Sequence, residues 1–205
     1  WYKGGVSISG ANSSSYLISP VSTADAANYY CVVTNSCGNA TSNTVALTVK
    51  SNVSISAQSS SQTLCAGSSP TLSVTTSGTA PITYQWYNSS GAIGSATNST
   101  YSLASIDTTE AGNYYCIATN SCASATSNSI TLTVNEAPSI VTNPASATVC
   151  QNLSAVFTVS TEGTSPMTYQ WYNGSGAISG ATASSYIIPQ VSTSHAGSYY
   201  VKATN

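Results

Sequence analysis

Apolar and polar residues alternate along short segments of the chain, most clearly between residues 51 and 135. An apolar residue at every second position is typical of a β-strand that buries one face. Segments rich in Gly, Pro, Asn and Ser separate these stretches and are typical of turns. No stretch has a helical period. The pattern predicts strands at 70–74, 81–87, 99–106, 113–120 and 127–134.

The same alternation predicts which side chains face the core. In YQWY, Trp86 lies on one face and Tyr87 on the other; in NYYC, Cys116 points inward and Tyr115 outward. About seven short strands in such a length favour an all-β sandwich. The inward set expected is Leu72, Val74, Ile82, Tyr84, Trp86, Tyr101, Leu103, Ile106, Tyr114, Cys116 and Ala118.

The sequence repeats itself with a constant step of 85 residues, as Trp1, Trp86 and Trp171 show. The Tyr-Tyr pairs that end at Tyr30, Tyr115 and Tyr200 keep this step, without insertion or deletion. A fixed internal period indicates an array of similar units.

The step also sets the domain boundaries that we expect. A complete unit at 51–135 lies between partial units at 1–50 and 136–205. We expect the sequence to be a window on a longer array, in which the residues after Asn205 resemble Ser-Cys.

Charge is scarce. Three lysines, no arginine and five carboxylates make 4 % of the residues charged, against roughly 25 % in ordinary soluble domains. This composition offers no basic surface for nucleic acid or anionic lipid. No apolar run approaches the ~20 residues that cross a bilayer, so we expect no membrane insertion. Six cysteines favour an oxidising, extracellular setting.

The segment TEAGNYYC (109–116) resembles the end of an immunoglobulin-type sandwich, in which a tyrosine stands two residues before the strand-F cysteine. Tyr114 takes the place of that corner tyrosine, and Trp86 that of the strand-C core tryptophan. The strand-B cysteine is replaced by Val74, and by Val159 in the third unit, where Val201 also replaces the strand-F cysteine. The resemblance implies tandem immunoglobulin-like repeats without the core disulfide, in which Cys31 and Cys116 are buried thiols.

Further motifs narrow the resemblance. A C-x-G before strand B, YQWY, GAIxxAT, AGxYY and TNxC recur in the chain. They are similar to the immunoglobulin-like repeats of large secreted and surface proteins of Bacteroidota, which leave the cell by the type IX route and include adhesins. The resemblance implies a secreted or cell-surface location. It also makes Thr108, in Asp-Thr-Thr, a candidate for O-glycosylation.

The other four cysteines are candidates for disulfides: Cys37, Cys65, Cys122 and Cys150. Cys65 stands before the A′–B corner and Cys122 in the F–G turn, which lie at opposite ends of a standard sandwich. One solution is a bond between the A′–B corner of one unit and the F–G turn of the next. The other is a Cys65–Cys122 bond within one unit, made possible by a shifted first strand. The sequence leaves both open.

Titratable residues give no sign of catalysis or metal binding. His195 occupies the position of Glu110 and Asp25 in the other units, which predicts a structural role at the E–F corner. The carboxylates form no cluster at the unit boundaries, where calcium ligands would be needed. The cysteines lack the doublets of a zinc site. We expect no enzyme activity, no metal and no cofactor.

Six tyrosines are candidates for surface contacts. Tyr87 and Tyr115 are expected to point out of neighbouring strands of one sheet, where they can stack on sugar rings or on another chain. The alternative is cross-strand packing that stiffens the sheet. The full set, with the equivalents in the other units, is Tyr2, Tyr30, Tyr87, Tyr115, Tyr172 and Tyr200.

Three functions remain open from the sequence. The first is a non-catalytic structural or adhesive array, a stalk or fibre of a large extracellular bacterial protein. The second is a series of carbohydrate-binding modules that bind a cell-surface or environmental polysaccharide through the tyrosines. The third is a subunit of an extracellular filament, whose partners are other copies of the chain.

Overall fold

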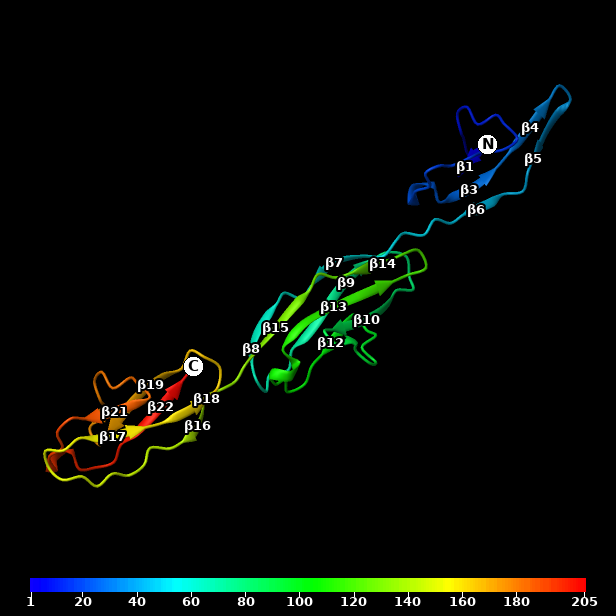
Figure 1. The fold of residues 1–205 in the computed structure, drawn as a ribbon. Coiled ribbons are helices and arrows are strands. Elements are labelled where there is room, and N and C mark those ends of the chain that lie inside the picture. The colour runs from blue at the N-terminus through cyan, green and yellow to red at the C-terminus, as the bar shows by residue number, and fades with distance from the viewer. The chain divides into compact units, whose positions relative to one another are not determined.

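The computed structural model describes residues 1–205, and strands make up nearly all of its regular structure. The central repeat, residues 51–135, is the most complete of the three (Figure 1). Its strands are β7 (Ser54–Gln58), β8 (Gln62–Cys65), β9 (Thr71–Ser77), β10 (Thr83–Asn88), β11 (Gly91–Ala92), β12 (Thr100–Ser102), β13 (Gly112–Thr119), β14 (Ser124–Thr126) and β15 (Ile130–Asn135).

These strands form two sheets. One has the order β11-β10-β13-β15-β8, with β14 also paired to β13, and the other has the order β12-β9-β7. All printed pairs are antiparallel except β8 with β15, which run parallel. This is the immunoglobulin-like sandwich expected from the sequence, with the first strand divided between both sheets.

The predicted core of the central repeat is confirmed. Trp86, Leu72 and Cys116 have no exposed surface, and Ile130 and Leu132 on β15 are as deeply buried. The Trp86 indole N–H donates to the Asn98 carbonyl at 3.0 Å, so the buried ring keeps its polar atom paired. The strand predicted at 99–106 is shorter, because Ser105 adopts a positive φ of 50° before the inward Ile106.

The first repeat contains β1 to β6. Cys31, predicted to be buried, is only half-buried, and so is Trp1. The strands equivalent to β7, β8 and β9 would precede Trp1, so no second sheet of this repeat covers these side chains. The strands are β1 (Tyr2–Lys3), β2 (Val6–Ser7), β3 (Ala27–Tyr30), β4 (Val32–Asn35), β5 (Gly38–Thr41) and β6 (Val45–Leu47).

The third repeat has a core around Trp171, which is fully buried with Val159 and Ala181 beside it. Phe157 and Tyr186 pack against this cluster. The strands are β16 (Ser139–Thr142), β17 (Ala155–Thr158), β18 (Ser160–Glu162), β19 (Thr168–Asn173), β20 (Gly176–Ala177), β21 (Ser185–Ile188) and β22 (Tyr200–Thr204).

A short 3₁₀-helix precedes strand β3, β13 or β22 in each repeat: η1 (Thr23–Asp25), η2 (Thr108–Glu110) and η3 (Thr193–His195). The predicted tyrosine corner follows each one. The Tyr114 hydroxyl donates to the Glu110 carbonyl at 2.7 Å, and Tyr29 and Tyr199 make the equivalent bonds to Asp25 and His195.

The chain groups into two compact units, and the division passes through the central repeat. One unit comprises Trp1–Gln58, Ser73–Thr100 and Tyr115–Asn128; the other comprises Ser59–Leu72, Tyr101–Tyr114 and Ser129–Asn205. Each end of the central sandwich therefore belongs to the same unit as the repeat next to it in sequence.

Candidate functional site

The six candidate tyrosines form three stacked pairs. Tyr87 and Tyr115 are directly opposite on β10 and β13, and their rings are 5.0 Å apart and 6° from parallel. In the first repeat, Tyr2 and Tyr30 stack at 4.8 Å and 2°. In the third, Tyr172 and Tyr200 stack at 4.8 Å and 4°. The structure therefore brings each predicted pair together.

The geometry of these pairs limits what they can bind. The ring separations equal the spacing of neighbouring strands, about 4.8 Å, so the parallel rings stand side by side on the sheet. Each ring covers one face of its partner, whereas stacking on a sugar needs an open face. All the rings are half-buried except that of Tyr200, which is 50 % exposed. This arrangement favours cross-strand packing as the first role of the pairs.

The third pair carries an additional cation. The Lys202 ammonium lies 5.2 Å from the centre of the Tyr172 ring, within the range of a cation–π contact. The positions one step and two steps earlier hold Ile117 and Val32, so this contact belongs to the third repeat alone.

The F-strand asparagines form the site that the sequence reasoning missed. The Asn120 side chain follows β13 and is only 9 % exposed. Its amide donates to the carbonyls of Ser51 (2.9 Å) and Thr79 (3.0 Å), and its oxygen accepts from the backbone N–H groups of Cys122 (3.0 Å) and Ala123 (3.1 Å). One side chain thus binds the first residue of the repeat, the β9–β10 turn and the β13–β14 turn.

The same bonds recur one step later. The Asn205 amide donates to the carbonyls of Glu136 (2.6 Å) and Thr164 (2.9 Å). In the first repeat, the Asn35 oxygen accepts from the N–H groups of Cys37 and Gly38. The 85-residue step of Asn35, Asn120 and Asn205 could have revealed them, but an asparagine in a turn is so common that polarity alone does not mark it.

Each of these asparagines lies beside a point that we call a joint, the peptide bond 50–51 or 135–136. Asn135 is the last residue of β15 in the central repeat. The next residue, Glu136, exchanges hydrogen bonds with Thr164: its N–H donates to the threonine hydroxyl at 2.7 Å, and its carbonyl accepts from the Thr164 N–H at 3.1 Å. No free residue separates the two sets of bonds.

The 50–51 joint is built in the same way. The Ser51 N–H donates to the Thr79 hydroxyl at 2.8 Å, and the Ser51 carbonyl accepts from the Thr79 N–H at 3.2 Å. Gly78 has a φ of 132°, and a Cβ there would lie 2.7 Å from the Asn52 carbonyl oxygen. Gly163 has the same φ and an equivalent clash with Ala137. The turn glycine is thus required by its close approach to the first residues of the repeat.

All six cysteines are free thiols in the structure. Burial raises the pKa of the Cys116 thiol above its ordinary value. The four candidate disulfide residues, Cys37, Cys65, Cys122 and Cys150, are exposed.

His195 has the structural role predicted for it. Its Nδ1 accepts from the Ser192 N–H at 3.0 Å and lies 2.9 Å from the Ser192 hydroxyl. In the central repeat the Glu110 carboxylate accepts from the Asp107 N–H at 2.8 Å in the same position. Thr108, the candidate for glycosylation, is the exposed first residue of η2.

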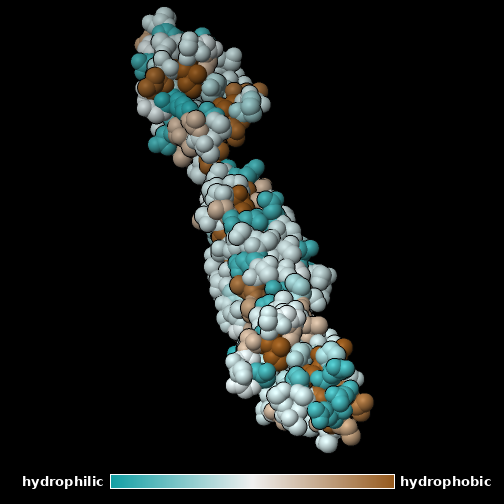
Figure 2. Space-filling view, turned by 90° about the vertical axis from the view of Figure 1, so that its left-hand side faces the viewer, coloured by the Kyte–Doolittle hydropathy of each residue, from teal (hydrophilic) through white to brown (hydrophobic).

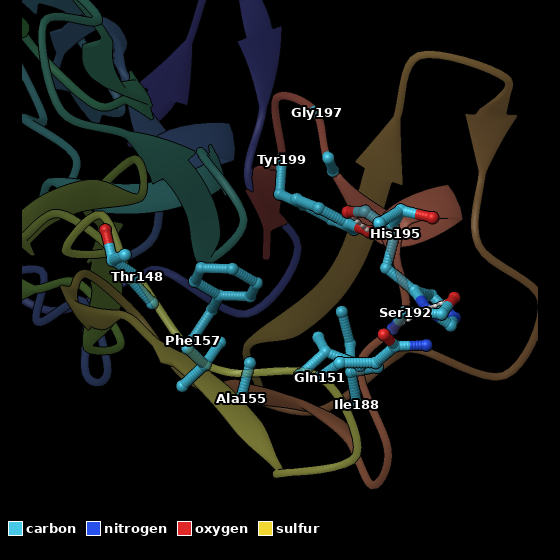
Figure 3. A pocket seen from close by; sticks show the side chains of 14 residues that line it. Thr148, Gln151, Ala155, Phe157, Ile188, Ser192, His195, Gly197 and Tyr199 are labelled. Carbon is cyan, nitrogen blue, oxygen red and sulfur yellow. Dashed lines mark hydrogen bonds between the residues drawn. The ribbon is translucent and has the colours of Figure 1, made fainter.

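A groove of about 350 Å³ runs along the third repeat, with Phe157, Ile188 and Tyr199 at its apolar floor (Figure 3). Gly197, Ala147 and Val149 also line it. In the central repeat the equivalents of these last three, Gly112, Gln62 and Leu64, are the residues paired with β15. The groove therefore has the place and the lining of the slot that β15 fills.

The surface of the chain is polar but almost uncharged. In the face shown in Figure 2, residues of intermediate hydropathy predominate, and the strongly apolar ones form small separate groups. The one ion pair, between Lys3 and Asp25 at 3.3 Å, is partly exposed. No group of three or more His, Cys, Asp or Glu side chains has metal-binding geometry. None of the helices has the length and apolar character needed to span a membrane.

Comparison with known proteins defines the class. Residues 53–135 match the family described as "Ig-like domain CHU_C associated", and residues 137–205 match the immunoglobulin domain family. The first match supports a bacterial immunoglobulin-like repeat. The chain is an all-β tandem of immunoglobulin-like domains, a non-catalytic class, and is not an enzyme.

Solved structures agree on the fold. The chain is similar over its full length to the I67–I69 fragment of the titin I-band, with 21 % identity, a TM-score of 0.78 and 82 % of that chain covered. It is also similar to immunoglobulin domains 1–4 of Sidekick-1, at 19 % identity and a TM-score of 0.61 over 90 % of this chain and 56 % of that one.

One curated relative is similar in sequence as well. It is the "Highly immunogenic outer capsid protein" of Enterobacteria phage T4, 33 % identical over 136 residues. The similarity covers 61 % of this chain and 35 % of the phage protein, so the chain spans about a third of that relative's length.

Proposed function

We propose that residues 1–205 are part of a structural or adhesive stretch of a large extracellular bacterial protein, in which successive repeats hold a binding region away from the cell. The observation that carries this proposal is the construction of the joints. Residues on the two sides of the peptide bonds 50–51 and 135–136 are each fixed by hydrogen bonds, with no linker between them. The proposed domains are therefore 1–50, 51–135 and 136–205.

Several features support an extracellular setting. The surface is rich in hydroxyl and amide groups and poor in charge. The match of residues 53–135 to the CHU_C-associated family supports export by the type IX route in a Bacteroidota species and an adhesin as the whole protein. The phage relative is described as an outer capsid protein, which agrees with display on an exposed surface.

A replacement experiment tests this proposal. In the native host, the central repeat of the full-length protein would be replaced by an unrelated immunoglobulin-like sandwich of similar length. A structural stretch predicts unchanged surface display and unchanged attachment of cells. Loss of attachment with normal display would contradict it, because it would place a specific binding site in the repeat itself.

A second candidate function is saccharide binding by the tyrosine pairs. The observation in its favour is that all three pairs lie in the same position on the outer side of a sheet, with Tyr200 half exposed. The test is a polysaccharide panel with the intact protein and with Tyr172→Ser/Tyr200→Ser. Binding that is lost in this variant and retained in an Asn113→Ala control would establish the function. Association with other copies of the chain would be seen as a concentration-dependent mass in the same samples.

We also propose that Thr108 is O-glycosylated. It is exposed and follows Asp107, whereas Thr23 and Thr193 occupy the same position after a serine. These two threonines are internal controls. Peptide mass spectrometry of the native protein should find a glycan on Thr108 and on neither control, and an unmodified Thr108 would refute the assignment.

A further inference from the structure

The four exposed cysteines belong to two classes that lie on opposite sides of each joint. Cys65 and Cys150 follow the strand position of β8, and Cys37 and Cys122 lie in the turn after the F-strand asparagine. We propose that a cysteine of the first class forms a disulfide with the second-class cysteine of the following repeat, so that each joint is closed by a covalent bond. This rests on the extracellular setting of the proposed function.

Cys65 lies directly beside the 135–136 joint. It is paired with Asn135 in the parallel β8–β15 ladder, and the Ala66 N–H donates to the Asn135 carbonyl at 2.8 Å. A cavity of about 250 Å³ is lined by Cys65 and, from the third repeat, by Pro166 and Asn205 among others. Cys65 therefore opens on the same cavity as the F-strand asparagine of the next repeat.

The turn after this asparagine has a fixed shape. In the first and central repeats the asparagine oxygen accepts from the N–H of the cysteine two residues later, at 2.9 Å for Cys37 and 3.0 Å for Cys122. If the third repeat keeps this shape and register, the second residue after Asn205 is a cysteine held next to the asparagine side chain. It would lie at the wall of the cavity that Cys65 lines.

The 50–51 joint shows the other half of this arrangement. The Lys50 ammonium donates to the Ser121 hydroxyl at 3.3 Å. Ser121 is the residue before Cys122, and Lys50 is the equivalent of Asn135, the strand partner of Cys65. The turn that carries Cys122 thus contacts the strand end that would be paired with a first-class cysteine of the preceding repeat.

The alternative bond within one repeat does not fit the strands. Ser124 is opposite Thr119 and Leu132 is opposite Gly112, so the turn with Cys122 and the strand end with Cys65 lie beyond opposite ends of β13. Eight residues of strand span about 24 Å or more, whereas a disulfide requires Cα atoms within about 7 Å. A Cys65–Cys122 bond would require unfolding of the sheet.

The bond forms by thiol–disulfide exchange with a protein or small-molecule disulfide as the oxidant. The Cys65 thiol loses its proton, and its thiolate attacks the oxidant and displaces one thiol. The second cysteine, also as a thiolate, attacks this mixed disulfide and displaces the other thiol. Two protein thiols lose two protons and two electrons, one sulfur–sulfur bond forms, and the oxidant is reduced to two thiols.

Successive bonds of this kind would overlap along the chain. From Cys37 to Cys65, and from Cys122 to Cys150, is 28 residues (65 − 37 = 150 − 122 = 28). Each bond encloses the rest of two repeats, so a force applied to the array could extend little more than these 28 residues per two repeats after unfolding.

Peptide mapping of the native full-length protein, alkylated without reduction, tests the proposal. We expect Cys65 linked to the turn cysteine of the following repeat, Cys122 linked to the preceding repeat, and Cys116 alkylated only after denaturation. In a Cys65→Ser variant, one turn cysteine, that of the next repeat, should become free. Free thiols at all four positions, or a Cys65–Cys122 peptide, would overturn the proposal. Neither result would change the hydrogen bonds at the joints that carry the proposed function.

The 205-residue chain provides a second measurement. Neither Cys65 nor Cys122 has its proposed partner in this sequence, so incubation with oxidised glutathione should give no bond within one chain. A monomeric product with a Cys65–Cys122 bond would contradict the assignment. The buried Cys116 is the matched control and should remain unmodified in the folded protein.

Discussion

Single side chains in this chain do their work at fixed positions of the repeat. The alternation of apolar residues was enough to predict Trp86, Tyr114 and Cys116 in the core, because each points into a two-sheet sandwich that excludes water. It was not enough to predict Asn120, because a buried amide with four backbone partners has the same sequence appearance as an exposed turn asparagine. Half-burial of Cys31 was also beyond it, since burial depends on a second sheet.

Replacement of Asn120 by alanine should destabilise the central repeat by about 2–4 kcal/mol. The change leaves two carbonyls and two N–H groups at the joint without their partners, and each unsatisfied buried group costs about 1–3 kcal/mol, partly offset here by access of water. Urea-dependent hydrogen exchange of peptides from residues 51–135 measures the effect.

The control is Asn113→Ala. Asn113 is exposed and its oxygen accepts one bond from the Thr131 hydroxyl at 2.8 Å, so its loss should cost less than about 1 kcal/mol. Equal effects of the two substitutions would show that Asn120 has no special role at the joint.

The tyrosine pairs should be energetically coupled. In a double-mutant cycle of Tyr87→Ser and Tyr115→Ser, the coupling free energy should be about 0.5–1.5 kcal/mol, as for other stacked aromatic pairs. Urea unfolding of the four proteins gives this value. Strict additivity would mean that the rings do not stabilise one another and would return attention to an external ligand.

At the scale of elements, the sequence predicted the strands better than their ends. The segment 99–106 was expected to be one strand, but β12 ends at Ser102 because the chain turns at Ser105. The tyrosine corner was predicted in position, and His195 in role, because both are local and repeat with the 85-residue step. The groove of the third repeat was not, since it depends on which strands lie side by side.

The E–F corner should make stability depend on acid pH. Hydrogen bonds from Thr109 lower the pKa of Asp107, and those from Ser22, with a smaller contribution from Lys3, lower the pKa of Asp25. A carboxyl group whose pKa is lowered by folding stabilises the protein above its unfolded pKa of about 3.9. That stabilisation should be lost as the pH falls below this value through the folded pKa.

Urea unfolding at a series of pH values between 6 and 2.5 tests this. Asp107→Asn keeps a good N-cap residue but removes the ionisation, so the stability of the central repeat should become less dependent on pH. The same slope in both proteins would show that Asp107 contributes nothing to the acid sensitivity.

The groove of the third repeat should accept a β-strand. A peptide with the sequence of residues 128–135, NSITLTVN, should bind there, because its alternating Ile, Leu and Val match the apolar floor around Phe157 and Tyr199. NMR chemical shifts of groove residues measure binding. A peptide with Leu132→Asp is the control and should not bind, since it places a charge on that floor. Equal binding of both peptides would contradict the match.

At the scale of the whole molecule, the constant 85-residue step predicted a tandem array, and the immunoglobulin-like fold of the chain agrees with it. The step could not reveal how successive repeats are connected, because the bonds at the joints come from residues far apart in sequence: Glu136, Thr164 and Asn205 at one, Ser51, Thr79 and Asn120 at the other. These bonds are the basis for a structural role.

The most direct test of that role is the backbone order of the joints, measured by ¹⁵N relaxation at residues 49–52 and 134–137. A joint without a linker predicts order parameters near those of the adjacent strands, about 0.85. Values below about 0.6 at these residues would show a flexible connection and would contradict the proposal that the repeats form a continuous structural stretch.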